Sequence, residues 1–241
     1  MSPANREMII VWDFDRTIIN AHCDRWLLLE TNLFTHLRKT LSHNSLMDRV
    51  FQELHSQGKT MDDLVNRLNT FTVDPQMISA IRSAHDLGCD MKVLSDANQF
   101  FIETILKKHG IYDCFSEIIT NPTVVEKDGR LRIFPYYGSN LSPHECKLCP
   151  PNLCKGLVMT AIQDSDKMKR GMIYIGDGRD DLCPTLKLRQ GDHVMPRKNF
   201  CLYRLLSKAK VPIKPKVHEW KDGEELNKNL IQLIVPPEVE V

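Results

Sequence analysis

The chain has 241 residues, of which 42% are hydrophobic and 26% charged, and its formal net charge is +1. This length suits one domain with an insertion, or two small domains, and is enough to bury a proper core. The near-neutral charge gives no electrostatic reason to expect a nucleic acid or an anionic membrane as partner, and no run of about 20 apolar residues predicts a membrane span.

The cysteines and the N-terminal segment bear on the cellular compartment. Residues 1–7 are polar and run directly into an apolar stretch, without the separate hydrophobic region of a secretory signal. Eight cysteines in a chain this long do not suggest a disulfide scaffold. We therefore expect a cytoplasmic protein with reduced thiols.

Three short apolar runs each stop at a polar, acidic or glycine-containing turn. They are Met8–Trp12, Met91–Leu94 and Met172–Ile175. Because apolar and polar residues hardly alternate in them, they predict strands buried on both faces, and hence a parallel sheet. Ligands bind at the carboxyl ends of the strands in such sheets, so we expect the residues after the three runs to meet at one edge.

Two helices are predicted on either side of the second strand. Asp74 followed by Pro75 is typical of a helix N-terminus, and Gly88 would end that helix. Another helix is expected to follow Asn98 and to end near Gly110.

The segment directly after the first strand has a different pattern. Its apolar spacing predicts three amphipathic helices, around Trp26–Leu29, Leu46–Leu54 and Leu64–Leu68, and Thr60 with Asp63 gives a capping signal before the last. An all-helical insertion at this place is interpreted as a mobile cap over the site. The alternative is that these helices simply cover one face of the sheet.

The segment at residues 121–142 and the overall order of the elements complete the prediction of fold and domains. Residues 121–142 are rich in proline, glycine and tyrosine and contain a Lys127–Arg130 turn, which predicts a hairpin or excursion. The fold class expected is α/β, with a three-layer, Rossmann-like parallel-sheet core. The core would comprise residues 1–20 and 73–241, and the helical cap residues 21–72.

Acidic residues follow the first and third apolar runs. Asp13 and Asp15 lie at the end of the first strand, where two close carboxylates repel each other unless a cation or a shared proton relieves them. In the segment Gly176–Asp181, two glycines bracket Asp177 and let the backbone approach a ligand, and the carboxylates are hard oxygen ligands suited to Mg²⁺. Taken alone, the Asp13–Asp15 segment is better explained as a solvated turn, and the Gly176–Asp181 segment is also consistent with a turn.

Ser95 and Lys155 are the other two candidates. Ser95 ends the second apolar run just before a predicted helix, where its hydroxyl and the backbone N–H groups can bind phosphate oxygens. An ordinary helix cap is the alternative. Lys155 precedes a predicted helix over Leu157–Ile162, and a lone lysine is most often a solvated surface charge.

Together and in this order, these segments resemble the haloacid dehalogenase (HAD) superfamily: Asp-x-Asp-x-Thr at 13–17, Ser95, Lys155 and Gly-Asp-Gly-x-x-Asp at 176–181. Further stretches, Val-Leu-Ser-Asp-Ala-Asn at 93–98 and His-x-Cys-x-x-Cys-Pro-x-Asn-x-Cys-Lys at 144–155, resemble the phosphoethanolamine/phosphocholine phosphatase family. The resemblance runs over essentially the whole chain. It is closest to the plant branch of thiamine-phosphate-phosphatase-like proteins and pyrophosphatases.

The resemblance implies roles for the acidic residues. Asp13 would be the nucleophile that forms an aspartyl phosphate, and Asp15 the general acid and base. The side chains of Asp13 and Asp177 and the backbone carbonyl of Asp15 would hold Mg²⁺. Asp181 would act from outside these ligands, orienting metal-bound water or the lysine.

The resemblance also implies the phosphate-binding residues. Ser95 and Lys155 would hold the non-bridging phosphate oxygens, and Thr17 is grouped with them because it would help to fix the nucleophile loop. Four aspartates and a phosphate face a single lysine charge, so a divalent ion is needed to offset the repulsion.

The start of the insertion departs from the family pattern, in which acidic residues are expected near positions 20 and 22. Here these positions hold Asn20 and His22, and only Asp24 remains acidic. Carboxylates there would suit a cationic head group, so their partial loss makes pyrophosphate or a less cationic ester more credible.

A cysteine-rich segment before Lys155 allows a second metal. His144, Cys146, Cys149 and Cys154 include a Cys-x₂-Cys pair, for which a structural zinc site is one interpretation. The other interpretation is a reduced, packed loop that positions Lys155.

The sequence therefore predicts a magnesium-dependent phosphoric monoester hydrolase that acts on a small soluble phosphate ester, namely phosphocholine, phosphoethanolamine or thiamine monophosphate. An inorganic pyrophosphatase of the same fold and a non-catalytic phosphate-ligand binding protein are the alternatives. The pairing of Asp15 with Asp13 argues against the latter, because binding alone requires no acid or base.

Overall fold

The computed structural model describes residues 8–25, 41–138, 144–208 and 212–235. Within these ranges, six parallel strands form one sheet in the order β3-β2-β1-β6-β7-β8. The strands are β1 (Ile9–Trp12), β2 (Asp90–Asn98), β3 (Glu117–Asn121), β6 (Met172–Gly176), β7 (His193–Pro196) and β8 (Lys216–Val217). The three apolar runs are thus confirmed as β1 and its two neighbours in the sheet, β2 and β6.

The central strand β1 is buried on both faces, which explains why its sequence does not alternate. Ile10 and Trp12 belong to one hydrophobic core, and Ile9 and Val11 belong to the other. Successive residues of a strand point to opposite faces, so four consecutive apolar residues supply both cores.

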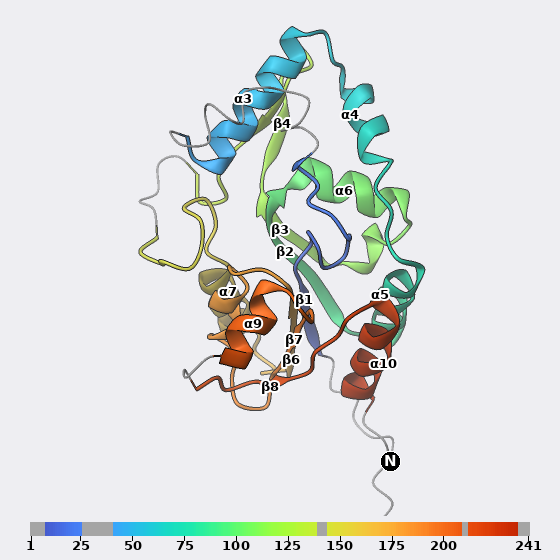
Figure 1. The fold of residues 1–241 in the computed structure, drawn as a ribbon, viewed down its shortest axis with the longest axis vertical. Helices are drawn as coiled ribbons and strands as arrows, with labels where there is room; N and C mark the ends of the chain where they lie inside the picture. Colours follow the sequence, from blue (N-terminus) through green and yellow to red (C-terminus); the bar gives the residue numbers. More distant parts are fainter. Residues whose placement is uncertain (1–7, 26–40, 139–143, 209–211, 236–241) are drawn as a thin grey trace, which may run out of the picture.

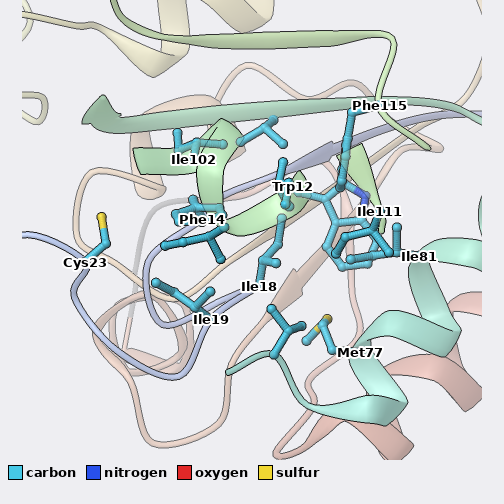
Figure 2. Packing of buried hydrophobic residues seen from close by; sticks show 14 of the residues in the cluster. Trp12, Phe14, Ile18, Ile19, Cys23, Met77, Ile81, Ile102, Ile111 and Phe115 are labelled. Atoms are coloured by element: carbon cyan, nitrogen blue, oxygen red, sulfur yellow. The ribbon is translucent and has the colours of Figure 1, made fainter. Parts of the chain in front are cut away.

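Helices cover both faces of the sheet, which gives the predicted three layers (Figure 1). The first core takes side chains from α5 (Pro75–Asp86), α6 (Gln99–Lys108) and α10 (Gly223–Ile234). The second core takes them from α7 (Lys155–Ser165) and α9 (Cys201–Lys208). A short 3₁₀ helix, Tyr112–Cys114, follows α6, and a four-residue helix, α8 (Leu182–Thr185), follows β6. Figure 2 shows Trp12 and Phe14 within the first core, near Ile81 and Ile102.

Local sequence signals set the helix starts that were predicted. The Asp74 side chain accepts a hydrogen bond from the backbone N–H of Gln76 at the start of α5. The Asn98 side chain caps α6 in the same way through the N–H of Phe101. Such caps satisfy N–H groups that have no partner within the helix.

Two of the three helices predicted after β1 are present: α3 (His43–Ser56) and α4 (Met61–Leu68). Thr60 and Asp63 form the expected capping box of α4. The helix predicted around Trp26–Leu29 falls outside the described residues. None of the described helices combines the length and apolarity that crossing a bilayer requires.

The predicted hairpin is formed by β4 (Thr123–Val125) and β5 (Leu131–Ile133), and α3 packs against β5. The carboxylate of Asp48 on α3 accepts hydrogen bonds from Arg132 Nε at 2.7 Å and from the Ile133 N–H at 3.2 Å. The helical insertion therefore packs on a segment from elsewhere in the chain, above the sheet in Figure 1. That this unit moves as a cap stays a prediction.

Candidate active site

The carboxyl edge of the sheet brings together the acidic residues of the first motif, residues 13–17, and the fourth motif, residues 176–181. Asp13 follows β1, and its N–H donates to the Ile175 carbonyl of β6 at 2.9 Å. Asp177 directly follows β6, and Asp181 lies four residues further on. Each of these three buried aspartates places a carboxylate oxygen within 4.8 Å of those of the other two. The expected convergence at one edge of the sheet is confirmed.

Lys155, the first residue of α7, is 1% exposed and lies among three carboxylates. Its Nζ is 2.8 Å from Asp13 Oδ1, 2.7 Å from Asp180 Oδ2 and 2.7 Å from Asp181 Oδ1. Burial alone would lower the pKa of Lys155, but the three negative charges outweigh burial and raise it well above its ordinary value. The lysine is therefore a fixed positive charge beside Asp13.

The Asp181 carboxylate is fully buried and accepts four hydrogen bonds. Oδ1 accepts from Lys155 and from the Tyr174 hydroxyl at 2.6 Å, and Oδ2 accepts from the N–H groups of Asp177 at 2.9 Å and Gly178 at 2.7 Å. A Cβ at Gly176 would lie 2.5 Å from Asp181 Oδ2, so only glycine fits there. Because both oxygens are already engaged, Asp181 is suited to hold its neighbours in place.

The acidic cluster fits a hard divalent cation. Burial and the negative charge of Asp181 raise the pKa of Asp13 well above its ordinary value. The same two causes raise the pKa of Asp177 to about 7. A divalent cation would offset this repulsion, and carboxylate oxygens are the ligands that Mg²⁺ prefers. The residues present therefore match the predicted metal.

A cavity of about 580 Å³ opens above Asp13. Its lining comes from the loop after β1, the N-terminus of α3, the end of β2, the fourth motif and the start of α9: Asp13, Asp15, Arg16, His22, Asp24, His43, Asp96, Ala97, Asp177, Gly178, Arg179, Asp180, Asn199, Phe200, Cys201 and Arg204. Ser95 and Lys155 do not line this cavity. Ser95 is fully buried, and its hydroxyl accepts a hydrogen bond from the Ala97 N–H at 3.3 Å.

Asp15 faces the cavity and is held by the segment that follows it. Its Oδ1 accepts from the Cys23 N–H at 3.0 Å, and its Oδ2 lies 3.5 Å from His22 Nδ1. The hydrogen bond to Asp15 raises the pKa of His22, against the effect of burial. His22 thus orients the second aspartate of the motif, a role that sequence reasoning missed.

Asp24 and Thr17 also contact neighbouring residues of the site. Asp24 Oδ2 lies 2.9 Å from His43 Nε2, and this hydrogen bond raises the pKa of His43. Burial would raise the pKa of Asp24, but His43 outweighs burial and lowers it. Thr17 Oγ1 donates to Asp177 Oδ1 at 3.4 Å, which links the first motif to the fourth.

Three of the lining residues, Asp180, His43 and Arg204, were not singled out from the sequence. Asp180 had a signal, since it adjoins Asp181 within the fourth motif, and it contacts Lys155. His43 and Arg204 had none, because their positions depend on how α3 and α9 pack. Arg16, which has a positive φ of 58°, lies over the Phe200 ring.

The chain is similar to known phosphatases in sequence and to a solved HAD family hydrolase in fold. A family model described as "Putative Phosphatase" matches residues 8–234. A "Thiamine phosphate phosphatase-like protein" of Arabidopsis thaliana is 50% identical over 234 residues, which cover 95% of this chain and 96% of that protein. "Inorganic pyrophosphatase 1" of the same plant is 48% identical over 229 residues, which cover 92% of this chain and 78% of that protein. The solved structure of a HAD family hydrolase from Salmonella enterica serovar Typhi aligns with 97% of this chain and 72% of its own, with a TM-score of 0.63 and 15% identity, and supports the fold alone.

Proposed function

The chain belongs to the Putative Phosphatase family of HAD-like hydrolases, and on that premise we propose that it is a magnesium-dependent phosphatase acting through an aspartyl phosphate on Asp13. The observation that carries this proposal is the position of the Asp13 carboxylate. It lines a cavity together with Asp15 and lies 2.8 Å from the Nζ of a buried lysine, Lys155.

Two carboxylates divide the chemistry between them. A carboxylate oxygen of Asp13 attacks the phosphorus, and the bond from phosphorus to the leaving oxygen breaks while Asp15 gives that oxygen a proton. Asp15 then takes a proton from a water molecule, which attacks the phosphorus, releases phosphate and restores Asp13. His22 and the Cys23 N–H hold Asp15 for both proton transfers.

The positive charges at the site serve to bind the phosphoryl group. Asp13 and Asp177, with the backbone carbonyl of Asp15, would hold the Mg²⁺, which supplies charge that neutralises the transferring phosphoryl oxygens. The Lys155 ammonium group contacts the Asp13 carboxylate directly and lowers its pKa, against the larger effects of burial and Asp181, and a bound Mg²⁺ would add to the effect of the lysine. Asp181 keeps Lys155 in that place.

For the substrate we propose a small phosphate ester with a cationic group, such as thiamine monophosphate, phosphocholine or phosphoethanolamine. Asp24 and Asp96 line the same cavity as Asp13, and we propose that they face the leaving group. The thiamine phosphate phosphatase-like relative supports this substrate class by its name.

A second candidate, inorganic pyrophosphatase, rests on a separate observation. Three arginines, Arg16, Arg179 and Arg204, line the same cavity and would attract the second phosphate of pyrophosphate. The pyrophosphatase relative supports it in the same way.

One assay separates the two candidates. Phosphate release would be measured with Mg²⁺ for thiamine monophosphate, phosphocholine, phosphoethanolamine, pyrophosphate and p-nitrophenyl phosphate, using wild type, Asp24→Asn and Arg204→Gln. For a cationic ester, Asp24→Asn raises the KM by about 10-fold and leaves p-nitrophenyl phosphate turnover nearly unchanged, since a charge-assisted contact contributes about 1.4 kcal/mol or more.

The opposite pattern would replace the first candidate by the second. It consists of preferred turnover of pyrophosphate, with a KM that rises in Arg204→Gln and not in Asp24→Asn. Absence of phosphate release from every compound by folded protein would contradict both candidates.

A further inference from the structure

A second cluster of metal-ligating side chains lies outside the cavity. Cys146, Cys149, Cys154 and Cys183 place their sulfur atoms within 4.8 Å of one another. The Cys183 sulfur lies 3.5 Å from that of Cys146 and 3.8 Å from that of Cys154. Four sulfurs bound to one zinc ion at about 2.3 Å in a tetrahedron are separated by roughly 3.8 Å. We propose that these four cysteines hold a structural Zn²⁺ ion.

The four ligands come from three parts of the chain. Cys146 and Cys149 form a Cys-x₂-Cys pair in the loop before α7, Cys154 is the residue at the N-terminus of α7, and Cys183 lies in α8. Close packing of the two helices brings Cys183 to the loop. A Cβ on Gly156 would lie 2.4 Å from the Cys183 sulfur, so only glycine at this position allows the approach.

The fourth ligand is therefore not the histidine that the sequence suggested. Both ring nitrogens of His144 are engaged within the loop: Nε2 contacts the Pro150 carbonyl oxygen at 2.8 Å, and Nδ1 accepts the Cys146 N–H at 3.2 Å. His144 thus orders the loop that carries the first two cysteines. Cys183, which lies 29 residues after Cys154 in the chain, is the fourth ligand in place of His144.

Backbone N–H groups favour the thiolate of Cys146, whereas burial and the neighbouring thiols raise the pKa of Cys149 and of Cys154. The Leu148 N–H donates to the Cys146 sulfur at 3.4 Å. Burial opposes ionisation of Cys146, but this N–H and that of Cys149 lower its pKa to about 7. The pKa of Cys149 is raised, first by its hydrogen bond with Cys183 and then by burial. Four thiolates this close repel one another, and a divalent ion removes that cost.

A disulfide explains the arrangement less well. The separation of 3.5 Å between the sulfurs of Cys146 and Cys183 is far longer than a bonded pair of about 2.05 Å. One disulfide would use only two of the four cysteines. A tetrahedral site uses all four.

The ion would connect this cluster to the active site. Cys154 directly precedes Lys155, and Cys183 lies two residues after Asp181. One ion would therefore fix the backbone next to both Lys155 and Asp181, whose side chains form an ion pair at 2.7 Å. Its position predicts a supporting role with no contact to substrate.

The test measures bound metal directly. Wild type, Cys183→Ser, His144→Gln and the control Cys114→Ser are reduced, supplied with excess Zn²⁺, desalted and analysed by inductively coupled plasma mass spectrometry. We expect about one zinc per chain in wild type, His144→Gln and Cys114→Ser. Cys183→Ser should bind zinc more than about 10-fold more weakly than wild type. Even the loss of a residue that only hydrogen-bonds a metal ligand typically lowers metal affinity by about 10–100-fold.

A second measurement does not depend on any variant folding. X-ray absorption at the zinc edge of the wild-type protein should give four sulfur neighbours at about 2.3 Å. Reduced, folded wild type that retains no zinc would overturn the proposal. So would a shell that includes nitrogen, or zinc that is lost in His144→Gln and kept in Cys183→Ser.

Discussion

Asp181 and Tyr174 show how single buried residues hold the active site in place. Asp181 is fully buried and accepts hydrogen bonds from Lys155, Tyr174 and two backbone N–H groups. A buried carboxylate is tolerated only when such partners replace its hydration. Burial, followed by the charge of Asp181, raises the pKa of Tyr174 well above its ordinary value, so the tyrosine stays a donor.

We predict that Tyr174→Phe lowers the free energy of unfolding by about 2 kcal/mol, the usual contribution of a hydrogen bond to a charged group. The phenylalanine ring keeps the packing and removes only the donor to Asp181. Urea denaturation measures the change, and Tyr203→Phe on α9, which is partly exposed, is the matched control. Equal stability of the two variants would show that this bond does not hold Asp181.

One ion pair joins α3 to the loop that follows β1. His43 is the first residue of α3, and its ring contacts Asp24 at 2.9 Å, so the pair holds one end of the helix over the cavity. The hydrogen bond to Asp24 raises the pKa of His43. The stabilisation is therefore full below about pH 6.5, the unfolded value, and is lost as the pH rises through the raised value.

We predict that His43→Gln destabilises the protein by up to about 1 kcal/mol near pH 5.5, and by almost nothing near pH 9. The magnitude is small because the His43 side chain is 40% exposed. Thermal unfolding of both proteins across this pH range measures the difference. In an Asp24→Asn background the pH dependence should vanish, and its persistence there would assign it to another group.

For the whole molecule, the carboxylates gathered at the cavity lower the stability of the folded state when no cation is bound. Burial and Asp181 raise the pKa of Asp177 to about 7. A raised carboxyl pKa means that stability falls as the pH rises from about 4 through the folded value. A bound cation returns this stability by binding only the folded state.

We predict that the effect of Asp177→Asn on stability changes sign when Mg²⁺ is added. In EDTA near pH 8 the variant should be more stable than wild type by about 1–2 kcal/mol, because a costly buried charge is gone. With excess Mg²⁺, wild type should gain stability and the variant should not. Melting temperatures in the two buffers measure this, and a wild type that is indifferent to Mg²⁺ would contradict the assigned ligand.

The sequence predicted those parts of the fold that depend on local chemistry. The apolar runs, the Asp74 and Asn98 caps and the Thr60–Asp63 capping box involve residues close in the chain, so their patterns are visible in it. The proximity of Asp13, Asp177 and Asp181 could also be predicted from the sequence, because the carboxyl ends of parallel strands lie at one edge of the sheet.

The features that the sequence did not predict are contacts over long separations. Cys183 meets the Cys-x₂-Cys loop only because α7 and α8 pack closely, and Asp24 meets His43 only because α3 lies over the cavity. Ser95 is fully buried, its hydroxyl accepts a hydrogen bond from the Ala97 N–H, and its role in phosphate binding stays a prediction. Side-chain direction at the end of a strand depends on packing that no local pattern records.

The proposed reaction requires that Asp13 carries the phosphoryl group and that Mg²⁺ is bound. The most direct measurement is phosphate release by wild type and Asp13→Asn, each with Mg²⁺ and with EDTA, beside the control Asp113→Asn at an exposed position. We predict release by wild type and Asp113→Asn with Mg²⁺ only, and a loss of about 10³-fold or more in Asp13→Asn. Release by Asp13→Asn at a rate near that of wild type would show that Asp13 is not the nucleophile.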